Sequence, residues 1–138
     1  MNERILKDAL RKLVKDCEET DTYCTYDLLT PRSVIELKNR RGNTIYPDTM
    51  LEHKKYTNNI GLDKDYIYVV ASDAHQAVYF WNVSKLTEKE YNFKWHKKGC
   101  PKTTDFSNNR YIKKYVGYLD WDDAYLVRSY NSLLTLLR

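Results

Sequence analysis

The chain has little glycine and proline, with only four glycines and three prolines among its 138 residues. This scarcity excludes collagen-like, linker-like and low-complexity classes, and the sequence contains no glycine-rich motif for cradling phosphates. It also lacks an apolar run of the roughly 20 residues needed to cross a bilayer, and its charged first residues contain no signal-peptide core. We therefore expect a cytoplasmic protein with no membrane partner.

Cysteine is equally sparse. Cys17, Cys24 and Cys100 are odd in number and widely spaced, which argues against a disulfide framework and against a four-thiolate zinc site. The three histidines are too scattered to form a recognisable zinc site. We expect free thiols, because unpaired cysteines tend to behave as small buried hydrophobic residues.

The basic residues are concentrated in one stretch. The whole chain carries a net charge of +4. Residues 85–114 hold nine lysines and arginines against three acidic residues, a balance of +6, so the remainder sums to −2. The chain also has thirteen tyrosines and three tryptophans. A basic, aromatic-rich region suits a phosphate-backbone partner, although a solvated charged surface over a tyrosine-rich core gives the same pattern.

The hydrophobic pattern indicates one domain over residues 1–138, with a core at about 3–83 and a basic C-terminal part at about 84–138. Apolar residues near the N-terminus repeat at a helical period, and β-rich runs flank a proline turn. The order of elements predicts an α/β (α+β) fold with a mixed sheet flanked by helices. We expect helices over 3–17, 47–59, 107–116 and 125–138, and strands over 23–29, 33–39, 66–71 and 77–83.

Three polar residues in the first predicted hairpin suit a hydrolytic site. Glu36 and Lys38 are two apart in a strand, so they project to the same face. A tight turn after the preceding strand brings Asp27 to the same end of the sheet. Two carboxylates beside an ammonium suit phosphodiester hydrolysis with a divalent cation. The carboxylates bind Mg²⁺, the ion polarises the phosphate and acidifies a water, and the lysine stabilises the developing charge.

The motif of Asp27, eight intervening residues and then Glu36-x-Lys38 in an apolar strand resembles the PD-(D/E)xK nuclease superfamily. The family usually has proline where Tyr26 stands. The resemblance implies a restriction-endonuclease-like α-β-β-β-α-β core, with Asp27, Glu36 and Lys38 as catalytic residues. It also implies that Glu3, at the start of the first helix, joins Asp27 and Glu36 as a ligand of Mg²⁺, for which Mn²⁺ can substitute.

Basic and aromatic residues elsewhere suit contacts to a nucleic-acid backbone. Some follow the Glu-x-Lys strand or lie on the next predicted helix, where family members often carry lysine or tyrosine. Others lie in the basic stretch, whose aromatic residues offer stacking platforms between cations. An ordinary solvated surface explains each group as well. The candidates are Arg40, Arg41, Lys54, Lys55, Tyr56, Lys97, Lys98, Lys102, Lys113 and Lys114.

The resemblance therefore predicts a Mg²⁺-dependent nuclease acting on DNA, with endonucleolytic or structure-specific action by analogy with small family members. Enzymes of this size often act as homodimers, and the residues do not distinguish DNA from RNA. The usage of Asn, Lys, Tyr and Ile indicates a phage or an AT-rich genome, so the cytoplasm that we expect is that of a bacterium or a phage-infected host cell. Two alternatives stay open: a non-catalytic module on the same fold that binds nucleic acid or protein, and a structural interaction protein.

Overall fold

The computed structural model describes residues 1–101 and 111–138. Its helices are α1 (Glu3–Leu13), α2 (His53–Ile60), α3 (Val83–Glu88) and α4 (Tyr130–Thr135), and a short 3₁₀ helix, η1, spans Trp121–Asp123. Its strands are β1 (Glu18–Glu19), β2 (Leu28–Leu29), β3 (Ser33–Arg40), β4 (Asp48–Glu52), β5 (Asp65–Ser72), β6 (Ala77–Asn82), β7 (His96–Pro101), β8 (Tyr111–Asp120) and β9 (Leu126–Ser129). No helix among these residues is long and apolar enough to cross a membrane.

The main sheet has six strands in the order β1-β2-β3-β5-β6-β9. β3 and β5 run parallel, whereas the other neighbouring strands are antiparallel. A parallel pair requires a crossover connection, and the chain makes it through β4 and α2. β4 itself belongs to a second, three-stranded antiparallel sheet of order β4-β8-β7.

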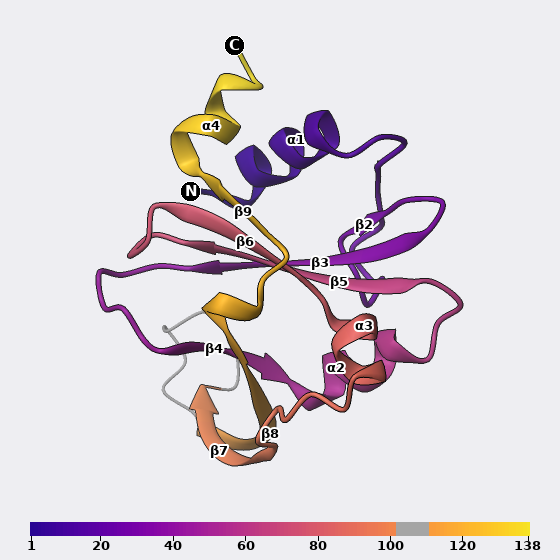
Figure 1. Ribbon diagram of the computed structural model, residues 1–138, viewed down its shortest axis with the longest axis vertical. Helices are drawn as coiled ribbons and strands as arrows, with labels where there is room; N and C mark the ends of the chain where they lie inside the picture. The colour runs from indigo at the N-terminus through magenta and orange to yellow at the C-terminus, as the bar shows by residue number, and fades with distance from the viewer. Residues whose placement is uncertain (102–110) are drawn as a thin grey trace.

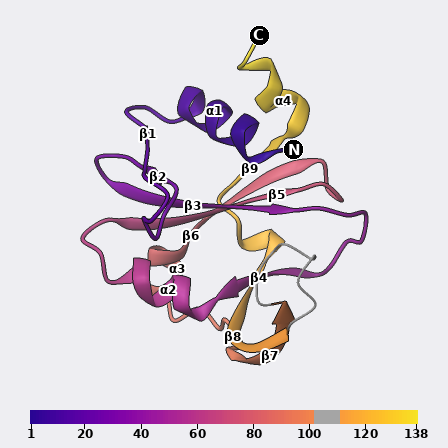
Figure 2. The same ribbon diagram turned by 180° about the vertical axis from the view of Figure 1, so that it is seen from behind.

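Helices cover both faces of the main sheet. α1 and α4 lie on one face, and α2, α3 and the second sheet lie on the other (Figure 1). The view from behind shows the same layers (Figure 2). The prediction of an α/β (α+β) fold with a mixed sheet flanked by helices is therefore confirmed at this level.

One hydrophobic cluster lies between the main sheet and its two terminal helices. Leu6 and Leu10 of α1 pack with Ile35 and Leu37 of β3 and with Leu133 of α4. The α1 residues are a turn apart, so they form one apolar stripe that faces the sheet. This cluster fixes α1 across the middle of β3.

A second cluster joins the main sheet to the small one. Tyr68 and Trp81 of the main sheet pack with Leu51 of β4 and Leu119 of β8. Trp81 is fully buried, and its indole Nε1 donates to the Asp120 carbonyl at 2.9 Å. The small sheet is thus attached to the face of the main sheet that α1 does not cover.

The first predicted helix and strand are both shorter than expected. α1 ends at Leu13 rather than at Cys17. The strand predicted over 23–29 is reduced to the two residues of β2. The chain before β2 turns instead, because the Asp21 carboxylate accepts the Tyr23 N–H at 2.7 Å.

Three predicted helices are wholly or partly strands. The helix expected over 47–59 begins as β4 and becomes helical only at α2, and the tail expected over 125–138 forms β9 before α4. The helix expected over 107–116 is wrong for its last residues, which belong to β8, while its start lies outside the described residues. Pairing of β4 with β8, and of β9 with β6, outweighs local periodicity.

Candidate active site

The polar candidates lie on β3, in the interior of the main sheet. Ile35 and Leu37 point to the cluster beneath α1, whereas Glu36 and Lys38 point to the opposite face, as strand alternation predicts. β4 and α2 cover that opposite face, so the Glu36 residue is only 7% exposed. The sequence indicated the shared face but not its burial.

Glu36 has two partners inside the fold. The Tyr66 hydroxyl, from the neighbouring strand β5, donates a hydrogen bond to its Oε1. The Lys55 Nζ, from α2, lies 3.9 Å from its Oε2. Burial raises the pKa of Glu36 to about 7, although both partners favour its charged form.

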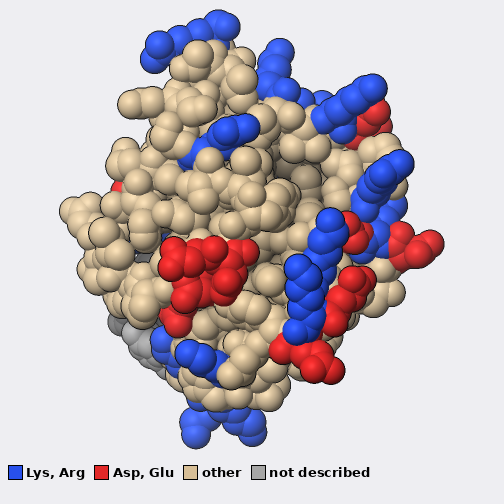
Figure 3. Space-filling view, in the orientation of Figure 1, with Lys and Arg blue, Asp and Glu red and all other residues tan. Residues whose placement is uncertain are grey.

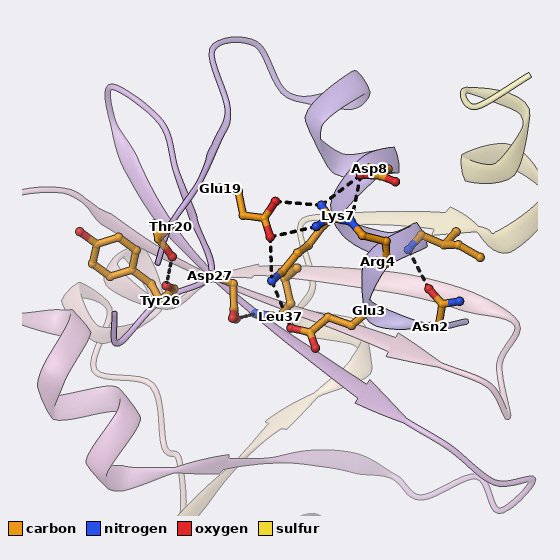
Figure 4. A network of polar contacts seen from close by, with 11 residues as sticks. Asn2, Glu3, Arg4, Lys7, Asp8, Glu19, Thr20, Tyr26, Asp27 and Leu37 are labelled. Carbon is orange, nitrogen blue, oxygen red and sulfur yellow. Dashed lines mark hydrogen bonds and ion pairs between the residues drawn. The ribbon is translucent and has the colours of Figure 1, made fainter. Parts of the chain in front are cut away.

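Asp27 is hydrogen-bonded to the same strand, β3. It directly precedes β2, and its N–H donates to the Ile35 carbonyl at 2.8 Å. Its Oδ2 accepts the Leu37 N–H at 2.7 Å, a bond drawn in Figure 4. Burial raises the pKa of Asp27 and the nearby charge of Glu3 raises it further, while the Leu37 N–H opposes both. Asp27 is thus held to the residue between Glu36 and Lys38.

Lys38 faces a small cavity with a volume of about 40 Å³. Glu36, Arg40, Glu52 and Lys55 line the same cavity. Burial and the charge of Arg40 lower the pKa of Lys38. The space suffices for ordered water between charged groups of both signs.

Glu3 lies across β3 from this cavity, on α1. Its carboxylate pairs with the Lys7 Nζ at 3.5 Å, and Lys7 is also 3.3 Å from Glu19 (Figure 4). Within residues 1–101 and 111–138, no group of three or more His, Cys, Asp and Glu side chains is arranged to hold a metal ion. The structure therefore brings Asp27 within electrostatic reach of both Glu36 and Glu3, and it pairs Glu3 with Lys7.

Four of the predicted nucleic-acid contacts already have protein partners. The Arg40 Nη2 donates to the Met50 carbonyl at 2.8 Å, and Lys55 lies against Glu36. The remaining two contacts are the Tyr56 hydroxyl with the Thr87 Oγ1 at 3.0 Å, and the Lys114 Nζ with the Glu52 Oε1 at 2.8 Å. Of these four residues, Arg40 and Lys55 line the small cavity of the site.

The other predicted contacts are exposed. Basic side chains gather at the end of the molecule formed by β7 and β8, while blue and red side chains alternate near α3 (Figure 3). This face of the molecule is therefore not uniformly basic. The exposed candidates are Arg41, Lys54, Lys97, Lys98 and Lys113, and Lys102 lies outside the described residues.

Sequence reasoning missed the role of Tyr66. Its contact with Glu36 depends on the parallel pairing of β3 with β5, which no local pattern specifies. A usable signal was the alternation of Tyr66 and Tyr68 in a β-rich run, which places two hydroxyl groups on one strand face. The Tyr68 hydroxyl donates to the Met50 carbonyl at 3.1 Å on that face.

Comparisons of the chain with models of known protein families, with curated proteins and with solved structures found no significant match. The chemistry of the site is therefore inferred from its side chains. Glu36 supplies a carboxylate to the small polar cavity, and Asp27 supplies a second one at the neighbouring residue Leu37. This donor set fits Mg²⁺, which binds through one or two carboxylates and keeps several of its waters.

Proposed function

We propose that this chain is a Mg²⁺-dependent nuclease of the PD-(D/E)xK type that hydrolyses phosphodiester bonds in DNA. The observation that carries the proposal is the junction of β2 and β3. There Asp27 accepts the Leu37 N–H at 2.7 Å, and Glu36 and Lys38 project together from the same strand into one cavity. The Asp27 carboxylate is thus held at the residue that lies between Glu36 and Lys38 in the same strand.

The order of elements supports the proposal. α1 precedes the antiparallel strands β1, β2 and β3, and α2 then leads to β5, which runs parallel to β3. This order agrees with the α-β-β-β-α-β core that the resemblance implies, with β4 added before α2. A restriction-endonuclease-like core is therefore part of the proposal.

Each proposed catalytic residue has a physical role. Asp27 and Glu36 hold the cation through their carboxylate oxygens. Bound Mg²⁺ supplies Lewis-acid polarisation of the phosphate and a more acidic water. Lys38 presents its ammonium to the same cavity and stabilises the negative charge that develops on the phosphate. Lys55, 3.9 Å from Glu36, adds a second cation at the cavity wall.

The test is cleavage of labelled single-stranded, duplex and four-way-junction DNA in Mg²⁺, Mn²⁺ or EDTA. Asp27→Asn, Glu36→Gln and Lys38→Met are the site variants. Glu88→Gln and Lys85→Met are matched controls, because both residues are exposed on α3. We expect metal-dependent cleavage that the controls retain and the site variants lose. Cleavage that survives all three site variants contradicts the proposal.

A second candidate is a nucleic-acid-binding module without catalysis. The observation that favours it is the ion pairing of the carboxylates by the chain itself, since Lys55 approaches Glu36 and Lys7 pairs with Glu3. Such a module binds DNA with a steep salt dependence that EDTA does not change. Titration of the protein with Mn²⁺ by calorimetry separates the two, because the module lacks a saturable site that Glu36→Gln removes.

A further inference from the structure

A groove of about 440 Å³ adjoins the candidate active site. Arg40 and Met50 line both this groove and the small cavity that contains Glu36 and Lys38. The rest of its lining comes from the chain that leads into β4, from the turn between β5 and β6, from the second sheet and from η1. Its volume lies within the range of about 300–1,000 Å³ that is typical of small-molecule sites.

The aromatic walls of the groove are fixed in place. The Trp121 Nε1 donates to the Tyr46 carbonyl at 2.7 Å, and the Trp121 ring centroid is 4.6 Å from that of His75. Tyr118 stacks on His96 with ring centroids 5.4 Å apart. The Tyr46 residue, in contrast, is 63% exposed. Flat rings held by their neighbours lose little conformational freedom when a planar ligand stacks on them.

The charged residues of the groove favour an anion. Three cations, Arg40, Arg41 and Lys98, line it together with one carboxylate, Asp48, among the described residues. The Lys98 Nζ lies 5.9 Å from the Tyr118 ring centroid. Cations beside aromatic rings are the combination that binds a base and its phosphate together.

Two of the acidic residues next to Trp121, Asp120 and Asp123, have partners within the fold. Figure 3 shows an acidic cluster over η1. The Asp123 Oδ2 accepts the Tyr91 hydroxyl at 2.9 Å, and the Asp120 Oδ1 accepts the Asp122 N–H at 2.9 Å. None of these carboxylates is part of the described lining of the groove.

We propose that this groove binds one unpaired nucleotide of a nucleic-acid strand whose neighbouring phosphate enters the candidate active site. The inference rests on the proposed function, since it places the scissile phosphate beside Lys38. The base stacks on the aromatic wall, and its phosphate meets Arg41 and Lys98. A strand suits the site better than a free nucleotide, because Arg40 and Met50 line both the groove and the small cavity, so the two sites are adjacent enough for consecutive nucleotides.

The test is fluorescence anisotropy with a fluorescein-labelled oligothymidine of about ten nucleotides, in EDTA so that no cleavage occurs. Tyr46→Ala and Lys98→Ala alter exposed residues of the groove, and Tyr125→Ala and Lys85→Ala are exposed controls outside its lining. We expect Tyr46→Ala to weaken binding by about fivefold or more, as loss of a base–aromatic stack does. Lys98→Ala should reduce the slope of log affinity against log salt by about 0.7.

Several results overturn this inference. The inference fails if the wild type does not bind at low salt, or if the four variants have equal affinities. It is also overturned if the matching duplex binds as tightly as the single strand, or if thymidine monophosphate displaces the oligonucleotide at equal affinity. Cleavage assays in Mg²⁺ separate the two proposals. Cleavage with groove variants that bind like the wild type removes only the groove proposal. Groove-dependent binding without any cleavage supports the groove and removes the nuclease proposal.

Discussion

The two faces of β3 differ in what covers them. On one face, Ile35 and Leu37 meet the apolar side chains of α1 and α4. On the other, Glu36 is almost as well buried, but it meets the Tyr66 hydroxyl and the Lys55 ammonium. One strand thus separates an apolar core from a second core in which charged side chains lie beside apolar and aromatic ones. The difference shows that a second sheet and a short helix, rather than solvent, surround the charged residues of this strand.

The largest expected effect is on the polar face. Lys38→Met removes the ammonium that faces the Glu36 cavity, so we expect cleavage of DNA to fall by about 10²–10³-fold. The fold should remain, because burial already disfavours the charged form of Lys38 and lowers its pKa. Single-turnover cleavage and circular dichroism measure the two effects. Lys85→Met is the control, and an equal loss of cleavage there assigns the effect to general charge.

A substitution on the apolar face should lower stability and leave cleavage unchanged, which is the opposite of the result expected for Lys38→Met. Leu6 is fully buried between α1 and β3, so Leu6→Ala should lower the free energy of unfolding by about 2–5 kcal/mol. Urea unfolding measures this loss. Cleavage by the folded fraction should stay near the wild-type rate, and a large loss of cleavage would mean that the two faces are coupled.

The stability of the protein should depend on pH through Glu36, on the polar face. Burial raises its pKa from 4.5 to about 7. The folded state therefore binds its proton more tightly than the unfolded state, and the resulting stability is fully present below pH 4.5 and lost as the pH rises through about 7. Between pH 4.5 and 8, the free energy of unfolding of the wild type should fall by about 3 kcal/mol relative to that of Glu36→Gln. Chemical unfolding in EDTA tests this, and parallel curves for the two proteins would contradict it.

A smaller effect is expected in the second sheet, which covers the polar face. A Cβ added at Gly117 would lie 2.7 Å from the Trp95 Cε3 and 2.9 Å from the Phe93 carbonyl oxygen. Gly117→Ala should therefore cost about 1–3 kcal/mol of stability. Gly99→Ala is the matched control, because its added Cβ meets no described atom within 4 Å. Equal unfolding midpoints for the two variants would show that this contact adjusts freely.

The smallest effect is expected at the surface of α1. Arg4 and Glu19 form two contacts of 3.0 Å, but their side chains are 53% and 32% exposed. Arg4→Gln should lower stability only slightly, and salt should reduce the difference further, because exposed ion pairs contribute little. Urea unfolding at two salt concentrations checks both statements. A larger loss that persists in high salt would indicate that Arg4 positions α1 on the sheet.

Local patterns predicted the elements that local forces specify. The apolar repeat predicted α1, and the run from Ser33 predicted β3. In both, the spacing of the apolar residues follows the period of the buried face. The segments of β4 and β9 fell within predicted helices as well, yet they are strands. Their partners, β8 and β6, are remote in the sequence, and no local window contains that information.

The candidate site also has a part that local patterns predicted and a part that depends on the complete fold. Strand alternation alone placed Glu36 and Lys38 on one face. The approach of Asp27 followed from the turn between two consecutive strands, and the bond to Leu37 agrees with it. The partners Tyr66 and Lys55 come from elements after the crossover, so their positions required the complete fold.

The pairing of β4 with β8 also bears on how the chain folds. Asp48 lies opposite Asp120 and Glu52 lies opposite Val116, so the small sheet closes a long loop that contains β5, β6 and β7. Such non-local pairing slows folding, because the entropy of loop closure is lost before the contacts form. During synthesis on the ribosome, β4 cannot pair until β8 has been synthesised. Nascent chains that stop before Val116 should therefore expose Leu51 and be accessible to protease between β3 and α2.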